Sequence, residues 1–413
     1  MTGKMRLLAA AALVCAWALP VASRADTVTV NTYATQPGSP WSKAWDYLKT
    51  EFEKENPGTE LKINQFDSGS FDTLARAFLV NESPDVFRHY GGGRLFDLVK
   101  AGLIEPSTRV WDDGGLRQDM AGLIPSMSYD GQLYCVPILV DSYGFFYRKD
   151  IFEKYGLAEP KTYDDLLKAA ATLKENGIVP FTIGTQQPWT TAAWFDYFIL
   201  RTAGIDFYFK LMAGEIPYTD PKVRHAMDLW GDLVKKDYFT PDHSAYTEET
   251  AAVFMVQGQS AMFLMGSFLL NNIPDEDKAK IGWFPFPTID PAIPTYEHGP
   301  ADTMCVPARA PNKAGGNKFL AFFGRADVQT AFTGIISSFP ANTRSTIRSN
   351  DMFQKMLQTL KDAKGLVQYY DIDTSREMAE IGMDAFQQFM FQPDNTDAIL
   401  TELDQQRQRI FKK

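Results

Sequence analysis

Two segments far apart in the chain carry the same interruption of an apolar run. Residues 134–150 read YCVPILVDSYGFFYRKD, in which Pro137 and then Asp141 break the run, and residues 304–307 repeat its start as MCVP. Proline cannot donate a hydrogen bond inside a sheet, so it marks an edge, a bulge or the end of a strand. Two matched breaks predict that the chain leaves one lobe for a second lobe and later returns.

The length of the chain agrees with two lobes. A chain of 413 residues exceeds what one hydrophobic core usually supports. With 45% hydrophobic and 22% charged residues, the composition is that of a globular protein. No apolar run beyond residue 25 is long enough to span a bilayer.

The first 25 residues have the pattern of a secretory signal. Lys4 and Arg6 precede an apolar run over residues 7–22, and small residues stand at Ser23 and Ala25, which predicts cleavage after Ala25. A membrane anchor is the alternative, but the apolar run is short and a polar strand follows it. Cys15 follows a valine rather than the small residue of a lipoprotein signal. We expect a soluble, exported, periplasmic protein.

Charge and motifs exclude several classes of function. The chain has 41 basic and 51 acidic residues, and its formal net charge of −10 disfavours nucleic acid and anionic membranes as partners. Motifs of serine hydrolases, zinc proteases and nucleotide-binding loops are absent from the sequence. The four histidines stand apart from one another and from the cysteines, so we expect no metal, no cofactor and no catalytic residues.

Two cysteines follow the signal, Cys135 and Cys305, each directly before a Val-Pro pair. Two are too few for a disulfide scaffold or a four-cysteine metal site. An oxidising compartment permits a bridge between them. Two buried thiols are the alternative, and they are slightly favoured because cysteine is among the most commonly buried residues; the sequence leaves both possibilities open.

The first part of the chain alternates strands with helices. Strands are expected near residues 27–33, 61–66 and 84–87, with helices from Pro40 and over 71–80, a pattern that predicts a parallel sheet. Ligands bind beyond the carboxyl ends of such strands. The loops there provide five candidates: Gln36, Trp41, Asp67, His89 and Arg94. Trp41 also fits a core position, and Asp67 a helix cap. Gly91, Gly92 and Gly93 favour a close-approach turn over an anion-binding loop.

The second part of the chain offers a further aromatic candidate. Thr162 and Asp165 predict a capped helix, so that acidic residue has a structural role. Trp189 ends the loop 184–189 that follows the expected strand 181–183. Because it stands beyond a strand and not on a helix face, it is the best candidate for a ring that stacks on a sugar, with surface packing as the alternative.

Four short stretches carry a family resemblance. They are PDV at 84–86, the segment 134–150, residues 255–268 (MVQGQSAMFLMGSF) and FPANTRS at 339–345. Together they resemble extracellular solute-binding proteins of sugar ABC transporters, the maltose-binding-protein-like family, over about residue 27 to the end. Phe268 stands where tryptophan is commoner, and the cysteines beside the crossings are unusual.

The resemblance implies an α/β, two-lobed periplasmic-binding-protein-like (type II) fold, with a helix-flanked sheet in each lobe and a multi-strand hinge. It places residues 26–137 and 306–340 in lobe 1, and residues 138–305 and 341–413 in lobe 2. It also adds ligand-binding candidates to the list: Asp141, Gly266, Ser267, Phe268, Gly299 and Arg344.

The expected function is capture of a small carbohydrate by hinge closure of a monomer, and its delivery to ABC transporter permease subunits in the inner membrane. An anionic sugar derivative is an alternative ligand, because Arg88, His89 and Arg94 cluster in one loop. A secreted carbohydrate-active enzyme is the alternative from another class. It would need two facing carboxylates, which Asp67 and Asp141 could supply.

Overall fold

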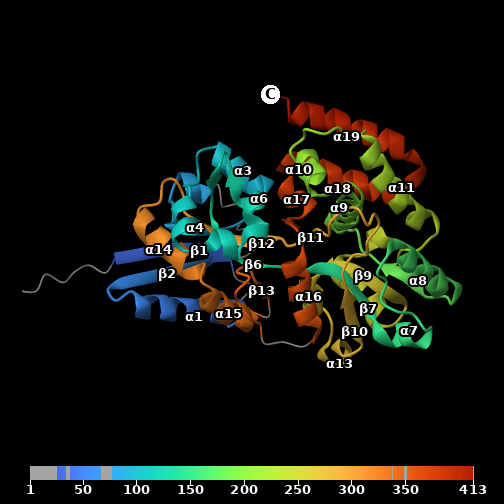
Figure 1. The fold of residues 1–413 in the computed structure, drawn as a ribbon, viewed down its shortest axis with the longest axis horizontal. Coiled ribbons are helices and arrows are strands. Elements are labelled where there is room, and N and C mark those ends of the chain that lie inside the picture. The colour runs from blue at the N-terminus through green and yellow to red at the C-terminus, as the bar shows by residue number, and fades with distance from the viewer. Residues whose placement is uncertain (1–25, 34–37, 67–76, 337, 348–350, 413) are drawn as a thin grey trace, which may run out of the picture.

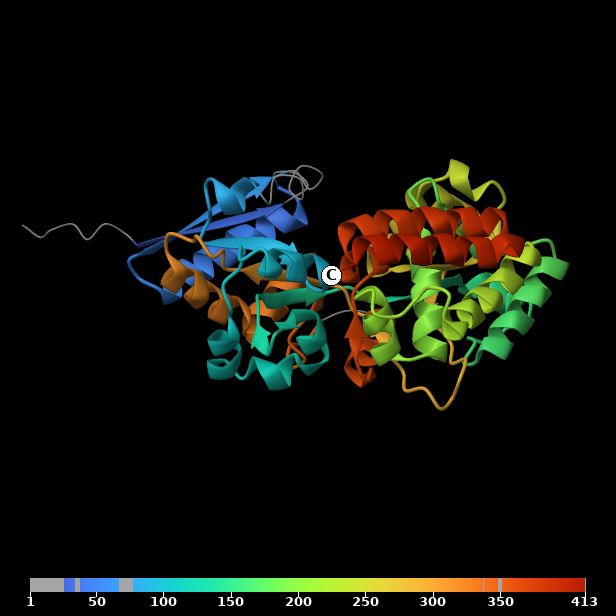
Figure 2. The same cartoon turned by 90° about the horizontal axis from the view of Figure 1, so that it is seen from above.

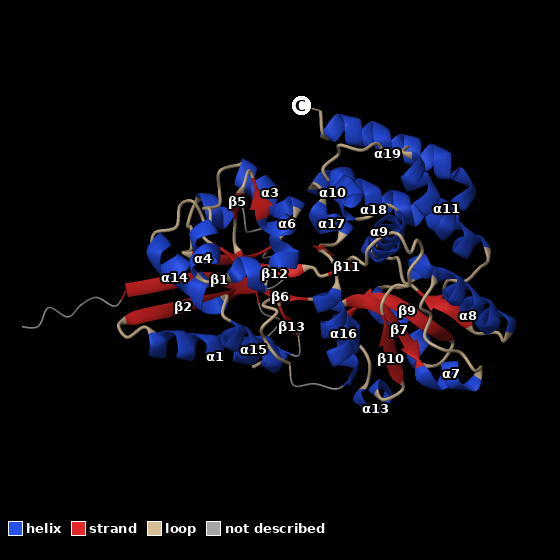
Figure 3. Ribbon diagram, viewed as in Figure 1, coloured by secondary structure: helices blue, strands red, loops and turns tan. Residues whose placement is uncertain are grey.

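The computed structural model describes residues 26–33, 38–66, 77–336, 338–347 and 351–412, which form two lobes side by side (Figures 1 and 2). Each lobe has its own sheet with helices packed around it (Figure 3). The two-lobed α/β architecture predicted from the sequence is therefore confirmed.

The first lobe contains a six-stranded sheet in the order β13-β6-β12-β3-β1-β2. Its strands are β1 (Asp26–Tyr33), β2 (Thr59–Phe66), β3 (Val86–Tyr90), β6 (Val136–Val140), β12 (Ala301–Cys305) and β13 (Phe339–Pro340). β1 pairs in parallel with β2 and β3, as the strand–helix alternation predicts. β12 is antiparallel to both β3 and β6. β12, the strand that returns from the second lobe, thus lies inside the sheet between β6 and β3.

Helices of the first lobe pack around this sheet. They are α1 (Pro40–Glu55), α3 (Gly93–Lys100), α4 (Thr108–Asp113), α5 (Leu116–Asp119), η1 (Ala121–Leu123), α6 (Ile124–Met127), α14 (Lys313–Phe323) and α15 (Ala326–Ile336), with a small hairpin of β4 (Ser128–Tyr129) and β5 (Gln132–Leu133). The Ser39 hydroxyl caps α1 by accepting from the Ser42 amide at 3.3 Å, and Pro40 begins the helix. Trp45 of α1 is fully buried, with its ring centroid 5.1 Å from that of Phe332. Trp45 is therefore a core residue.

The second lobe contains a four-stranded sheet in the order β10-β7-β9-β8. Its strands are β7 (Tyr143–Arg148), β8 (Val179–Thr182), β9 (Ser260–Gly266) and β10 (Ile281–Phe284). β7 is antiparallel to β9 and β10, and β8 is parallel to β9. Every residue of β7, β9 and β10 is buried, because helices cover this sheet.

The helices of this lobe are α7 (Lys149–Lys154), α8 (Tyr163–Glu175), α9 (Trp189–Thr202), α10 (Ile205–Met212), α11 (Pro221–Lys235), η2 (His243–Ala245), α12 (Glu248–Val256), η3 (Ser267–Asn271), α13 (Asp275–Lys278), α16 (Asp351–Asp362), α17 (Tyr370–Asp373), α18 (Arg376–Phe391), η4 (Pro393–Asn395) and α19 (Thr396–Ile410). The predicted capping box is present. Thr162 accepts from the Asp165 amide, and the Asp165 carboxylate accepts from the Thr162 amide.

The positions of the crossings differ from the expected ones. β6 stays in the first sheet to Val140, and β12 belongs to it from Ala301 onward. The sequence-based division placed these crossings at Pro137 and Cys305 instead. Pro137 lies inside β6, opposite a register shift between Asp302 and Thr303 of β12. A bulge at this point accommodates the missing N–H of proline, so the strand continues past it.

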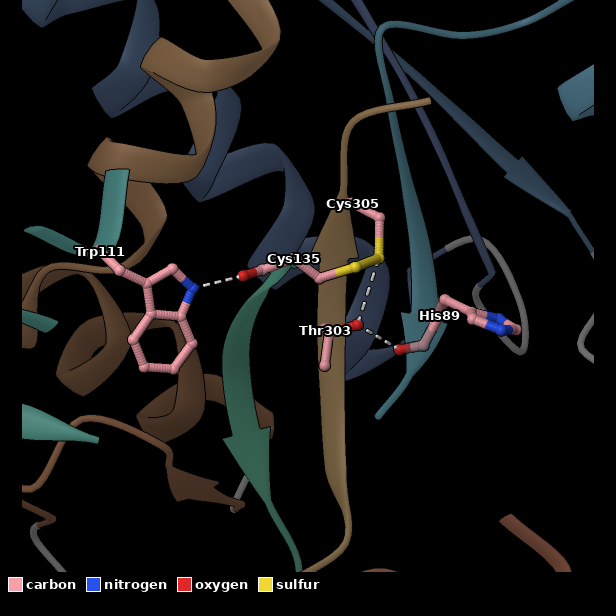
Figure 4. The surroundings of a disulfide bond; sticks show 5 residues. All are labelled: His89, Trp111, Cys135, Thr303 and Cys305. Carbon is pink, nitrogen blue, oxygen red and sulfur yellow. Dashed lines mark hydrogen bonds between the residues drawn. A yellow bond between two sulfur atoms is a disulfide. The ribbon is translucent and has the colours of Figure 1, made fainter. Parts of the chain in front are cut away.

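A disulfide joins Cys135 and Cys305, with a Cα–Cα distance of 4.2 Å (Figure 4). The two residues border β6 and β12, which lie side by side in the first sheet. The Cys135 carbonyl accepts a hydrogen bond of 2.7 Å from the Trp111 indole, and both cysteines are fully buried. Of the two possibilities that the sequence left open, the structure contains the bridge.

A short parallel ladder lies beside the return crossing. β11 (Glu297–His298) pairs with β14 (Leu366–Val367). The Gly299 amide continues this pairing by donating to the Val367 carbonyl at 3.0 Å.

Among the described residues, no helix is both long enough and apolar enough to cross a bilayer.

Candidate functional site

Asp141 stands where the first hinge strand leaves the first lobe. It follows β6, and its amide donates to the Pro300 carbonyl of the return crossing at 3.1 Å. Its carboxylate accepts a hydrogen bond of 3.1 Å from the Ser267 hydroxyl, which lies just after β9 of the second lobe. The structure therefore brings together two of the candidate residues that the sequence separated by more than a hundred positions.

A buried ion pair lies beside Asp141 in the first lobe. Arg88 of β3 donates through Nη2 to the Asp302 carboxylate of β12. The two side chains are 2% and 11% exposed. Arg88 and Asp302 lie on the same face of the sheet, because the residue opposite Arg88 is Met304, two positions beyond Asp302. Nη1 and Nε of Arg88 have no hydrogen-bond partner among the described residues.

Two aromatic rings pack against the Arg88 guanidinium. Its central carbon lies 3.6 Å from the ring centroid of Tyr33 and 4.3 Å from that of Trp41, so the cation contacts both π-faces. Tyr33 ends β1, and Trp41 lies in the first turn of α1. Trp41 is partly buried and also contacts Phe332 of α15, so it is at once a packing residue and part of the wall beside Arg88.

Burial controls the charge of Asp141. Desolvation raises the pKa of Asp141 to about 7, and the Asp302 carboxylate adds to the rise. The hydrogen bond from Ser267 and the charge of Arg88 oppose it. A carboxyl group with this pKa is partly protonated near neutral pH, so it can donate as well as accept a hydrogen bond.

The second lobe contributes a group of aromatic rings at the same junction. Phe268 follows Ser267, and its ring centroid lies 6.0 Å from that of Trp189 and 6.5 Å from that of Tyr143. A Cβ atom on Gly266 would lie 2.2 Å from the Phe268 ring, so glycine is required for this packing. Gly266, Ser267 and Phe268 therefore form one compact unit next to Asp141.

Trp189 lies in a different local structure from the predicted one. It is the first residue of α9, whereas the sequence analysis placed it at the end of the loop 184–189 and not on a helix. Pro188 takes the N-cap position, and the first turn does not need the N–H that proline lacks. The Trp189 ring is half-buried, and its indole nitrogen donates to the Gln187 side chain at 3.3 Å. The prediction that it stacks on a ligand stays a prediction.

The glycine loop, residues 91–93, forms a close contact between the two lobes. A Cβ atom on Gly93 would lie 2.4 Å from the carbonyl oxygen of Asp373, in α17 of the second lobe. A Cβ atom on Gly92 would lie 2.2 Å from the Asp373 carboxylate. Gly92 also has φ of 74°, which favours glycine. These contacts confirm the close-approach turn and leave no space there for a bound anion.

Arg94 bridges the lobes next to this loop. Its Nε donates to the Asp371 carbonyl at 2.9 Å, and its Nη2 lies 3.1 Å from the Asp371 carboxylate. Each of the two arginines that suggested an anionic ligand, Arg88 and Arg94, is thus paired with a carboxylate. His89 lies on β3, where its carbonyl accepts from the Thr303 hydroxyl at 3.0 Å. The centroid of its ring lies 5.8 Å from that of Phe87 and 6.0 Å from that of Tyr90.

The remaining candidates differ in their surroundings. Arg344 pairs with Asp119 of α5, and its side chain is 65% exposed. Gly299 is buried against β14, where an added Cβ atom would lie 2.8 Å from the Leu366 side chain. Gln36 and Asp67 lie outside the described residues, and so does most of the helix expected over 71–80.

Within the described part of the chain, no group of three or more histidine, cysteine or acidic side chains could hold a metal ion.

Sequence reasoning missed several residues of this junction. Asp302 and Tyr33 were not candidates, and neither were Gln368 and Tyr369, discussed below. Asp302 had a usable signal, since it lies two positions before Met304, the first residue of the MCVP repeat, and on the same strand face. Tyr33 ends a predicted strand, which also places it at the ligand-binding edge of a parallel sheet.

Comparison with known proteins identifies the family of this chain. The family of bacterial extracellular solute-binding proteins matches residues 36–330. An uncharacterized ABC transporter extracellular-binding protein of Pyrococcus horikoshii, PH1214, is 31% identical over 329 residues, which cover 76% of this chain and 71% of that protein. The melibiose/raffinose/stachyose-binding protein MelE of Bacillus subtilis is 24% identical over 73% of this chain and 72% of MelE.

Solved structures match over almost the full length of the chain. The bacterial solute receptor AcbH, described as having an exclusive preference for β-D-galactopyranose, superposes with a TM-score of 0.85 at 25% identity, covering 94% of this chain and 99% of AcbH. RafE in complex with raffinose has the same fold, with a TM-score of 0.71 at 20% identity, covering 93% of this chain and 99% of that one. The chain belongs to the family of bacterial extracellular solute-binding proteins.

Proposed function

We propose that this protein captures an uncharged carbohydrate between its two lobes and delivers it to the permease of an ABC transporter. The observation that supports this most directly is the polar cluster of Asp141, Arg88 and Asp302 at the hinge, with aromatic rings beside it in both lobes. Aromatic faces pack on the apolar faces of sugar rings, and carboxylates accept strong hydrogen bonds from hydroxyl groups. MelE, named for the sugars that it binds, and AcbH, described as preferring a galactopyranose, support the same class of ligand.

Hinge closure provides the mechanism. A ligand that contacts Asp141 and Arg88 on one side and Phe268 on the other binds the closed arrangement of the lobes better than the open one. It therefore shifts the population toward closure by the difference in affinity. The permease then distinguishes the closed, loaded protein from the open one. Specificity comes from buried hydrogen bonds, since a wrong sugar leaves polar groups unpaired.

The pairing of both arginines argues against an anionic ligand. Arg88 and Arg94 each face a carboxylate, and Asp141 adds negative charge to the same region. A sugar acid or sugar phosphate would meet this negative charge, and the two described arginines at the junction are each already paired with a carboxylate. The family consists of binding proteins, and we propose that this chain likewise performs no catalysis. We also propose that it acts as a monomer in the periplasm after cleavage behind Ala25.

A thermal-shift screen tests this function. Purified protein without its first 25 residues is melted with a panel of neutral mono-, di- and oligosaccharides, and separately with uronic acids and sugar phosphates. Binding to the native state raises the melting temperature, so a neutral sugar should produce a shift of several degrees and the anions none. The affinity for that sugar should change less than about twofold between about 50 mM and about 500 mM salt, because no charge pairing is involved. A shift with the anions alone, or turnover of an oligosaccharide, would contradict the proposal.

A further inference from the structure

Two buried polar groups near Asp141 lack partners among the described residues. Gln368 is fully buried. Its Oε1 accepts a hydrogen bond of 2.7 Å from the Ala301 amide, but its Nε2 has no partner. The hydroxyl oxygen of Tyr369 is also buried and has no partner. Most buried polar side-chain atoms in proteins are hydrogen-bonded, so two adjacent exceptions need an explanation.

The surroundings of these residues place them at the junction of the lobes. They connect β14 to α17, between the return crossing and the glycine loop of the first lobe. The side chain of Gln368 packs beside Gly92, and the amide that it binds belongs to the residue before Asp302. The Tyr369 ring packs on Tyr143, with centroids 5.5 Å apart, and stacks on His298 at 5.7 Å.

Electrostatics connects Tyr369 to Asp141. Burial raises the pKa of the Tyr369 phenol well above its usual value, and the Asp141 carboxylate is the neighbouring charge that raises it most. The Tyr369 hydroxyl therefore stays protonated and is a hydrogen-bond donor. Gln368 Nε2 is a donor as well, and Asp141 accepts or donates according to its protonation. The charges nearby are mainly negative, and Arg88 is already paired with Asp302.

We propose that Gln368 and Tyr369 determine ligand specificity by holding the oxygen atoms of an uncharged sugar ring. Gln368 Nε2 and the Tyr369 hydroxyl each donate a hydrogen bond to a sugar oxygen, and Asp141 binds an adjacent hydroxyl. This inference rests on the proposed function. It names the residues of the site that would distinguish one sugar from another. Both residues lie beyond residues 36–330, the part of the chain that the family match covers.

Buried hydrogen-bond donors without a protein partner are suited to discriminating between sugars. In the unliganded protein they reduce the stability of the fold, because a buried donor has lost its hydrogen bond to water. A sugar oxygen at the right place restores that bond, whereas a sugar with the opposite hydroxyl configuration leaves the donor unpaired. Such sites discriminate strongly between isomers for this reason.

The substitution Tyr369→Phe tests the proposal, because it removes only the hydroxyl group. The full exported chain is compared with wild type by calorimetric titration of the sugar that stabilises wild type most, and by melting without ligand. Loss of an unpaired buried hydroxyl should leave the unliganded melting temperature unchanged or raise it. The affinity for the sugar should fall by about tenfold or more, because the hydrogen bond from the Tyr369 hydroxyl to a sugar oxygen is lost.

Tyr218→Phe is the matched control. Tyr218 is also a fully buried tyrosine of the second lobe, but its hydroxyl lies 2.6 Å from that of Tyr370. Its loss should lower the melting temperature and leave the sugar affinity unchanged. A second variant, Gln368→Glu, keeps the oxygen that accepts from Ala301 and replaces the donor by an acceptor. It should weaken the sugar affinity as well.

The outcomes separate the inference from the function on which it rests. Wild-type affinity in Tyr369→Phe, with sugar binding by wild type intact, would mean that the hydroxyl has a structural partner such as a buried water, and would overturn this inference alone. Wild-type protein that binds none of the neutral sugars would overturn the proposed function and this inference together. Weaker binding in Tyr369→Phe with an undiminished melting temperature would support the assignment.

Discussion

Cys135 and Cys305 form a disulfide that ties the start of β6 to the end of β12, the two neighbouring strands that connect the lobes. The bridge spans 170 residues of sequence, so it closes a loop that contains most of the second lobe. It lies at the first-lobe end of the crossings, away from Asp141 and Ala301, where the chain passes between the lobes. The bond can therefore stabilise the first sheet without restricting hinge rotation.

Replacing both cysteines should lower stability and leave ligand affinity unchanged. We expect the double variant Cys135→Ala/Cys305→Ala to lose about 2–5 kcal/mol of unfolding free energy, the usual range for a native disulfide that closes a long loop. Denaturant unfolding of the variant and of oxidised wild type measures the difference. Its sugar affinity, measured by titration below the transition, should match that of wild type. A large loss of affinity in folded variant would show that the bridge also positions the site.

Asp141 should give the stability of the protein a specific dependence on pH. Burial raises the pKa of Asp141 to about 7 in the folded protein, above the unfolded value of about 4. The folded state then holds a proton that the unfolded state has lost between these two values. The contribution of Asp141 to stability therefore falls as pH rises from about 4 to about 7, and is constant above that range. Asp141→Asn removes this contribution.

We compare the melting temperatures of Asp141→Asn and wild type. The difference, variant minus wild type, should increase as the pH rises from about 5 to about 8. Asparagine keeps an oxygen that accepts from Ser267, so the fold should be retained. Sugar affinity should fall, because the charge-assisted hydrogen bond to a hydroxyl is lost. A constant difference in melting temperature across this range would show that Asp141 is ionised throughout. Unchanged sugar affinity would remove Asp141 from the site.

Trp189→Ala should weaken sugar binding and leave the fold intact. The ring is half-buried, with its centroid 6.0 Å from that of Phe268, so its removal exposes little of the core. Ring pairing contributes about 0.5–1.5 kcal/mol beyond burial, so the loss of binding free energy should be a few kcal/mol at most. Calorimetric titration and circular dichroism measure the two effects. Trp194→Ala, which empties a fully buried position in the same helix, is the control that should lose stability.

Gly93→Ala should disturb the contact between the lobes. The added Cβ atom would meet backbone atoms of Asp373 at 2.4 and 2.8 Å, and backbone cannot rotate aside as a side chain can. We expect a destabilisation of about 1–3 kcal/mol, typical of overpacking, together with a larger radius of gyration in small-angle scattering.

Gly334→Ala is the control for this variant. Gly334 lies in α15, and apart from its chain neighbours and its own helix backbone, no atom of the described residues lies within 4 Å of an added Cβ atom there. The change should be neutral or slightly stabilising, because alanine favours a helix. A Gly93→Ala protein with wild-type stability and dimensions would mean that the glycine loop does not hold the two lobes together.

The sequence by itself determined the features that depend on nearby residues. The Ser39 cap, the Thr162–Asp165 capping box and the parallel pairing of β1 with β2 follow from local preferences and from strand–helix alternation. The matched breaks at Pro137 and Pro307 were enough to predict two lobes. The motifs around Asp141 and Ser267 pointed to residues that the structure brings within 3.1 Å of each other.

Only the tertiary structure decided the features that depend on the order of the strands and on contacts between segments far apart in the sequence. Whether Cys135 bonds Cys305, and whether Arg88 is free or paired with Asp302, depends on β12 lying between β3 and β6. No local preference specifies that order. The extension of β6 past Pro137 likewise depends on a bulge in β6 itself, where Ile138 is the extra residue between the pairs Leu139–Asp302 and Pro137–Thr303. Gln368 and Tyr369 lie at the junction of the lobes because the β14–α17 segment packs against the return crossing, and the local sequence does not specify such long-range packing.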